Sequence, residues 1–254
     1  MMASSASSVG CLQARWPIQT FLVPIHVNVP ALPGSVCAHL LQTMVKFVLF
    51  IREQISAPYH EISALVDSEQ LRRSSGKPCC RSSAMNRYIK FVSEAEAVLS
   101  AISNVCARFR IHRVYLVLGS ALTSAREIFD VTFSDQNGLT ADYGIETGNE
   151  QIMDAISRSM LRQLISTYSE VLPTNTQRST LFLLVQCDRG PDCPDGFVPK
   201  HNLAIRPRKD AVQLRVCVRN HTDLVNDEDD AGDRLWFQSC TSIKGLRGVP
   251  LPNT

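Results

Sequence analysis

Hydrophobic residues recur every three or four positions in three long segments of the chain, which is the spacing of one face of an α-helix. These segments cover residues 36–55, 89–109 and 150–171. The first is apolar around most of its circumference, so we expect it to be a buried core helix. The apolar stripe of the third consists of Ile152, Met153, Ile156, Met160, Leu161, Leu164, Ile165 and Tyr168. This stripe is wider than a core contact alone needs, which makes the third helix a candidate interaction surface.

Shorter segments show the two-residue alternation or the continuous apolar runs that are typical of β-strands. They cover residues 21–29, 114–119, 127–134, 180–187, 197–206, 212–218 and 235–243. Pro24 and Pro30 confine the first strand to a sheet edge or to its own ends, because proline cannot donate to a central ladder. The late strands follow one another closely, which favours antiparallel pairing. The pattern predicts an α+β fold, with about three helices packed on a mainly antiparallel sheet.

The same pattern divides the chain into one domain and its flanks. We expect a flexible tail at residues 1–17, a single domain at 18–248 and a short tail at 249–254. Within the domain, residues 67–87 are rich in Ser and Arg and poor in apolar side chains, which indicates a mobile surface loop. We expect residues 223–233 to form an acidic, solvated loop.

Composition narrows the classes of function. The chain has 254 residues, 44% of them hydrophobic, and a net charge of +2, which does not suggest a nucleic-acid-binding protein. The most apolar stretch, residues 36–51, contains His39 and Lys46 and is shorter than the ~20 residues that cross a bilayer, so we expect no membrane association. The Ser- and Ala-rich opening precedes the first acidic residue, Glu53, so an organelle-targeted protein of unrelated function remains an alternative.

Motifs for catalysis, metal binding and cofactor binding are absent from the sequence. The nine cysteines include no C-x-x-C pair, and the chain has no phosphate-binding glycine loop, no G-x-S-x-G and no H-E-x-x-H. We therefore predict no catalytic residue, no metal and no cofactor. A thiol-dependent enzyme remains an alternative, because a cysteine and a histidine can meet in space without being close in sequence.

Four blocks, in order, resemble the comet family, whose members bind the mitotic-arrest-deficient checkpoint protein and silence the spindle checkpoint. The blocks are Phe21–Ile25 with the helix that follows, Arg113–Gly119, Phe197–Lys200 and Trp236–Gln238. The resemblance covers roughly residues 20–248. It implies the HORMA fold of the partner itself, three helices on a sheet closed by a C-terminal "safety belt". That belt would include Leu235, Trp236, Phe237 and Gln238, with the two aromatic residues as anchors.

The resemblance also implies where the checkpoint protein binds. Leu161 on the third helix stands where family members place a large apolar contact residue, with Arg158 and Arg162 as flanking charges. Ile51 and Arg52, near the end of the first helix, fall in the family's second contact region. Simple burial is the alternative interpretation of Leu161.

A second implied partner is the pachytene-checkpoint AAA+ ATPase, which would contact Pro199 and Lys200. A turn proline followed by a solvated lysine is the alternative interpretation of this pair. The expected function is that of a non-enzymatic adaptor that binds the closed conformer of the checkpoint protein and delivers it to the ATPase. We expect such an adaptor in the nucleus and cytoplasm, including the kinetochore or spindle.

Overall fold

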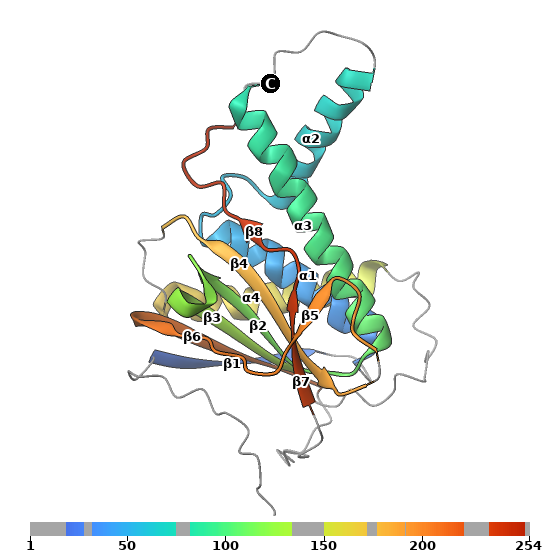
Figure 1. Ribbon diagram of the computed structural model, residues 1–254, viewed down its shortest axis with the longest axis vertical. Helices are drawn as coiled ribbons and strands as arrows, with labels where there is room; N and C mark the ends of the chain where they lie inside the picture. Colours follow the sequence, from blue (N-terminus) through green and yellow to red (C-terminus); the bar gives the residue numbers. More distant parts are fainter. Residues whose placement is uncertain are drawn as a thin grey trace, which may run out of the picture.

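The computed structural model describes residues 19–27, 32–74, 82–133, 150–171, 177–190, 192–220 and 234–251. In this part of the chain, helices cover one face of an eight-stranded sheet (Figure 1). The helices are α1 (Gly34–Ile51), α2 (Tyr59–Ser74), α3 (Ser83–Arg108), α4 (Glu150–Val171) and the short 3-10 helix η1 (Leu122–Ser124). The strands are β1 (Gln19–Val27), β2 (Ile111–Gly119), β3 (Ala125–Phe133), β4 (Thr180–Asp188), β5 (Phe197–Lys200), β6 (Pro207–Asn220), β7 (Arg234–Ser239) and β8 (Ile243–Lys244).

The sheet is mixed, with the order β1-β6-β3-β2-β4-β7-β5, and β8 pairs with β4. Strand β6 is parallel to both of its neighbours, β1 and β3, while the other ladders are antiparallel. The predicted α+β fold is therefore confirmed. Of the two arrangements that Pro24 and Pro30 allowed for the first strand, the structure has β1 at a sheet edge. The order of the strands could not be predicted, because β1 and β6 lie far apart in the sequence and become neighbours only through the packed core.

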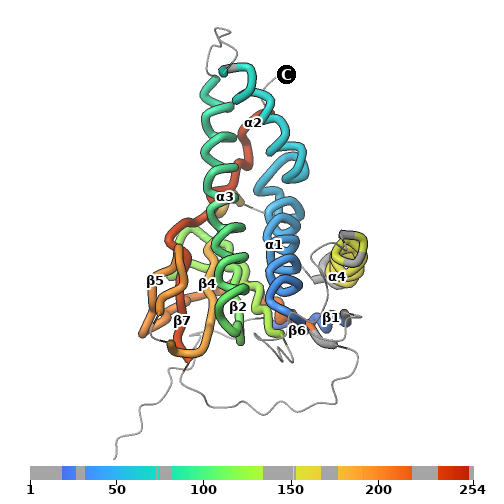
Figure 2. The backbone as a smooth tube through the Cα atoms, turned by 90° about the vertical axis from the view of Figure 1, so that its right-hand side faces the viewer, coloured from blue at the N-terminus to red at the C-terminus, as the bar shows by residue number. Residues whose placement is uncertain are grey.

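Helix α1 lies between α3 and α4 and fills the centre of the helical layer (Figure 2). By length and composition α1 could cross a membrane, but half of it is buried inside the protein. Its buried residues are Val36, Cys37, Ala38, Leu40, Leu41, Met44, Val45, Val48 and Leu49. This burial is what a core helix requires, and it agrees with the apolar circumference seen in the sequence.

Residues 67–87 were expected to be a mobile loop, but the described parts of this segment, 67–74 and 82–87, are almost entirely helical. Helix α2 continues to Ser74 and α3 begins at Ser83, whose preceding residue Ser82 caps the helix by accepting a 3.1 Å hydrogen bond from the Met85 N–H. Ile62 and Val66 of α2 are buried. Few apolar residues suffice there, because α2 packs on α3 along one side only; the two helices project from the sheet as a hairpin (Figure 1).

Proline blocks both open edges of the sheet. In β1 the His26 N–H points away from β6 and donates to Gln163 Oε1 of α4 over 3.2 Å. Pro24 is two residues earlier and points the same way, so this edge lacks a donor there. In β5 the Phe197 N–H donates to the Pro194 carbonyl over 3.1 Å, so it is not available to a further strand. The backbone nitrogen of Pro199, two residues later, points to the same open side and carries no hydrogen. Neither edge readily accepts an added strand at these positions.

The predicted strand at residues 235–243 is divided into β7 and β8. Strand β7 lies between β4 and β5, so the C-terminal strand is part of the sheet. Phe237 is buried in the main core, whereas Trp236 lies on the opposite face and stacks on Tyr115 with ring centroids 4.5 Å apart. The alternation of side chains along a strand separates these two adjacent aromatic residues. The predicted strand at 197–206 is short and ends at Lys200. The acidic residues 223–233 lie outside the described residues.

Candidate partner-binding surface

Helix α4 presents a mixed apolar and cationic face to solvent. Its inner side is fixed by Ile156, Met160 and Leu164, which are buried in the core. Leu161 is partly buried against that core, and Ile165, one turn later, is 51% exposed. Arg158 and Arg162 are exposed, and the Arg158 Nε–H donates to the Asp154 carbonyl within the helix. The structure thus places Leu161 at the border between core and surface, and adds Ile165 to the residues implied by the resemblance.

Polar contacts hold α4 against its neighbours. Ser157, one turn before Leu161, lies with its hydroxyl 2.6 Å from His39 Nε2 of α1. Burial lowers the pKa of His39, so the ring is neutral at pH 7. On the other side of α4, the side chain of Gln163 holds the edge of β1. These two attachments fix the position of α4, so its exposed face is presented by a rigid element.

At the end of α1, the two contact residues implied by the resemblance, Ile51 and Arg52, differ in their exposure to solvent. Ile51 is 36% exposed, and the neighbouring Phe50, which the sequence did not single out, is 43% exposed. Arg52 is only 5% exposed. Its guanidinium makes a bidentate ion pair with Glu127 of β3, with 2.8 Å between Nε and Oε2. Arg52 therefore lies inside the protein, where it supports the end of α1, and its guanidinium is not displayed to a partner.

A signal for this ion pair is present in the sequence. Glu127 is in phase with Phe129, Val131 and Phe133, which face the main core. A carboxylate at a core-facing position of a strand requires a cationic or hydrogen-bonding partner, because an unpaired buried charge is costly. That reasoning predicts a partner for Glu127, although the identity of Arg52 follows only from the folded chain.

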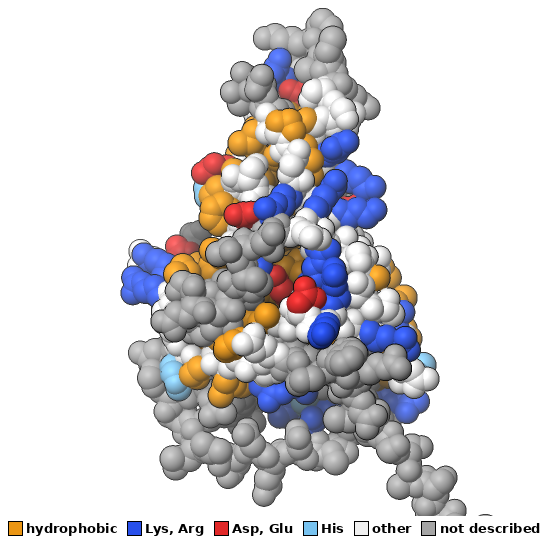
Figure 3. Space-filling view, turned by 90° about the vertical axis from the view of Figure 1, so that its left-hand side faces the viewer, with side chains coloured by type: hydrophobic (Ala, Val, Ile, Leu, Met, Phe, Trp, Pro, Cys, Tyr) orange, Lys and Arg blue, Asp and Glu red, His pale blue; other side chains and the backbone are white. Residues whose placement is uncertain are grey.

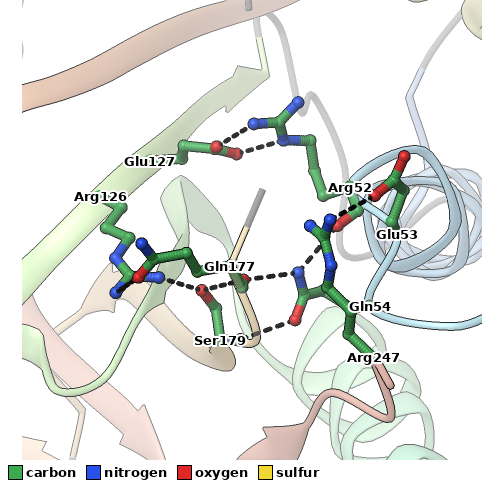
Figure 4. A network of polar contacts seen from close by, with 8 residues as sticks. All are labelled: Arg52, Glu53, Gln54, Arg126, Glu127, Gln177, Ser179 and Arg247. Carbon is green, nitrogen blue, oxygen red and sulfur yellow. Dashed lines mark hydrogen bonds and ion pairs between the residues drawn. The ribbon is translucent and has the colours of Figure 1, made fainter. Parts of the chain in front are cut away.

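Gln54 joins three segments just after α1 (Figure 4). It is 1% exposed. Its Nε2 group donates to the carbonyls of Arg52 at 2.8 Å and Gln177 at 3.1 Å, and its Oε1 accepts from the Ser179 N–H at 2.7 Å. Every polar atom of this buried amide is used. The loop after α1 is thereby fastened to the segment that leads into β4.

The chain after β8 is bound to the same network. The Leu246 N–H donates to the Gln54 carbonyl over 2.5 Å, and the Gly245 N–H donates to the Ser179 carbonyl over 2.9 Å. Further along, Val249 is buried, and the Tyr88 hydroxyl of α3 donates to its carbonyl over 3.3 Å. The described part of the C-terminal segment is thus held along the helical layer. Residues 252–254 of the predicted tail lie outside the described residues.

Replacing Gly245 by alanine should destabilise the fold by about 1–3 kcal/mol, the usual effect of inserting a methyl group into filled space. An added Cβ would lie 2.3 Å from Gln54 Oε1 and 3.0 Å from the Ser179 carbonyl oxygen. Urea unfolding measures the change. Gly190→Ala is the matched control, because its nearest neighbouring atom would be 4.0 Å away. Equal stability of the two variants would contradict the close packing described here.

Strand β5 displays the pair implied for the ATPase contact. Pro199 is exposed and Lys200 is half-buried opposite Trp236 of β7. Between them and the turn, Val198 is 41% exposed. These residues lie together on one edge strand, β5, which is a different element from the α4 helix proposed for the other contact.

Thiol chemistry finds little support in the described residues. Burial raises the pKa of Cys37 and of Cys187 to about 12, so both thiols stay protonated at neutral pH. The pKa of Cys106 is raised for the same reason, and that of the exposed Cys193 is also raised. Among the described residues no group of three or more His, Cys, Asp or Glu side chains is arranged to hold a metal ion.

Comparison with known proteins shows which family the chain belongs to. The sequence model of the p31comet family, described as Mad1 and Cdc20-bound-Mad2 binding, matches residues 4–248. The mouse MAD2L1-binding protein is 27% identical over 238 residues, which is 89% of this chain and 79% of the relative. The human MAD2L1-binding protein is 24% identical over 228 residues, which is 85% of this chain and 78% of the relative. With its helices on a mixed sheet, the chain belongs to the p31comet family of non-enzymatic, checkpoint-related binding proteins.

Proposed function

We propose that this protein is an adaptor that binds the closed, Cdc20-bound conformer of a Mad2-type protein through α4 and presents it to the pachytene-checkpoint AAA+ ATPase. Remodelling by the ATPase would then silence the spindle checkpoint. Family membership supports the binding of Mad2 and the checkpoint setting. We propose three further points beyond family membership: the contact residues, the preference for the closed conformer and the delivery of Mad2 to the ATPase.

The exposed face of α4 is the observation that carries the partner-binding proposal. A solvated helix would present polar residues, yet α4 leaves Ile165 half-exposed and Leu161 at the surface border, with Arg158 and Arg162 alongside. An apolar centre with arginine at its rim is typical of protein interfaces. The exposed Phe50 and Ile51 at the end of α1 supply a second apolar patch for the same partner.

The position of β7 supports an adaptor that does not bind a linear peptide by strand addition. Because β7 pairs with both β4 and β5, the chain's own C-terminal segment occupies that place in the sheet. The adaptor then needs only a higher affinity for one conformer of its partner, and ATP hydrolysis by the ATPase supplies the work of remodelling.

Pro199 and Lys200 form the proposed contact with the ATPase. Pro199 leaves the open edge of β5 without a backbone donor, so we expect the contact to be made by side chains and not by an added strand. The ammonium group of Lys200 can pair with an acidic side chain of the ATPase.

The double variant Pro199→Ala with Lys200→Ala should slow the ATPase-driven release of Cdc20 peptide from Mad2 by about tenfold, while Mad2 binding stays unchanged. The measurement uses the full chain with Mad2, the ATPase and ATP. Lys200→Ala alone removes the charge without opening the edge, and Lys244→Ala, an exposed lysine of β8, serves as the matched control. Normal remodelling by the double variant would contradict the proposed contact; loss of Mad2 binding as well would indicate misfolding.

We also propose that the protein acts in the nucleus and cytoplasm, including the kinetochore or spindle, where Mad2-type proteins would be met. A fluorescent fusion of the full chain, followed through mitosis, tests this. Exclusive import into an organelle other than the nucleus would contradict it.

A further inference from the structure

Arginine residues from four separate segments meet at one end of the sheet. We propose that this arginine face, defined as Arg126, Arg178, Arg206 and Arg247, binds an acidic polypeptide segment of a partner protein. On the side of the molecule drawn in Figure 3, Lys and Arg side chains lie across the middle of the surface, with some Asp and Glu side chains among them. The inference is independent of the contacts proposed for α4 and β5.

Contacts between backbone and side chains bring the four segments together. Arg126 of β3 donates to Gln177 Oε1 at 2.6 Å and to Ser179 Oγ at 3.4 Å (Figure 4). Arg178 stands between Gln177 and Ser179 in the sequence, and its Nε–H donates to the Gly245 carbonyl at 2.7 Å. Arg247 comes two residues after Gly245, and its Nη2 atom lies 3.0 Å from Glu53 Oε2.

Arg206 joins the face through β3. Its carbonyl accepts a 3.1 Å hydrogen bond from the Ala125 N–H, and its own N–H donates to the Leu122 carbonyl at 3.0 Å. The residue next to Ala125 in the strand is Arg126, so the backbones of the two arginines are tied together. The side chain of Arg206 is exposed.

The charge of this face is largely uncompensated. Arg126 and Arg178 are held by an amide, a hydroxyl and a carbonyl, all of them neutral acceptors. Neither these two guanidinium groups nor that of Arg206 has a carboxylate partner among the described residues. Two carboxylates of the neighbouring polar network are already paired, Glu127 with Arg52 and Glu53 with Arg247. Guanidinium groups that are fixed in place and retain free N–H donors favour carboxylate ligands, which they bind in a bidentate manner.

The small net charge of the whole chain argues for an acidic peptide over a nucleic acid. A nucleic-acid-binding face normally belongs to a strongly basic domain, whereas this chain carries only +2. The arginine face is local, and its fixed groups come from segments that the Gln54 network holds rigid. An extended acidic segment can offer separate carboxylates to Arg126, Arg178 and Arg206, while Arg247 keeps its pairing with Glu53.

Fluorescence anisotropy with a labelled hexaglutamate peptide and the full chain tests the proposal. We expect binding that weakens with added salt and that falls about tenfold or more in the variant Arg206→Glu with Arg126→Gln. Arg206→Glu alone should weaken binding severalfold without touching the Gln54 network. Arg158→Glu with Arg162→Gln is the matched control, because it lowers the charge of α4 by the same three units and should leave peptide binding unchanged.

Three outcomes would overturn the proposal. Hexaglutamate could bind no better than hexaglutamine, or the α4 control could lose as much affinity as the variant of the arginine face. A single-stranded oligonucleotide of equal charge could also bind more tightly than the peptide, which would make the face a nucleic-acid site. Thermal unfolding of each variant, compared with that of the unaltered chain, shows that a loss of affinity is not a loss of fold.

Discussion

Replacing Leu161 by aspartate is expected to weaken binding of the closed Mad2 conformer by at least about 100-fold, which corresponds to the loss of an interface hot spot. Leu161 lies at the border of the surface, next to the exposed Ile165 and the cation of Arg158. A carboxylate there would place a charge within an apolar contact. Isothermal titration of the full chain with Cdc20-peptide-bound Mad2 measures the change.

Because Leu161 also touches the core, its variant alone could lose binding through damage to the fold. Ile165→Asp removes this ambiguity, since Ile165 is mostly exposed and is not among the residues packed on the core. We expect it to weaken binding by about 10-fold or more with an unchanged melting temperature. Ser166→Asp places the same charge about 100° further around the helix and should have little effect.

If Leu161→Asp and Ile165→Asp both bind Mad2 as tightly as the unaltered chain does, α4 is not part of the interface. The partner would then have to use another surface, such as the apolar patch of Phe50 and Ile51 at the end of α1. Loss of binding in Leu161→Asp alone, accompanied by a lower melting temperature, would instead favour simple burial of Leu161.

Periodicity predicted those elements whose two sides meet different environments. The stripe along residues 150–171 predicted α4 with its bounds, and the alternation at Val212–Val218 predicted the centre of β6, because one side of each faces the core. Helix α2 was missed, since only Ile62, Val66 and a few neighbours pack inward and the rest is solvated. A weak apolar stripe beside many serines has the composition of a loop even when the segment is helical.

The candidate site was less predictable than the fold. The resemblance treats the neighbouring residues Ile51 and Arg52 as one contact region, but the structure exposes the first and buries the second. This division depends on Glu127, which is far away in the sequence. The role of Gln54 depends in the same way on Ser179 and Leu246, so no local pattern could reveal it.

The variant Arg52→Ala should destabilise the protein by about 3–5 kcal/mol, because it leaves the buried carboxylate of Glu127 without its partner. A loss of this size is a large part of the stability of a typical domain and could unfold it. Urea unfolding measures the change.

The double variant Arg52→Met with Glu127→Leu separates the two roles of Arg52. It removes both buried charges and keeps apolar volume, so most of the lost stability should return. If Arg52 only positions the end of α1, this stable double variant will bind Mad2 about as well as the unaltered chain. A stable double variant that no longer binds Mad2 would show that the guanidinium contacts the partner, which its burial against Glu127 argues against.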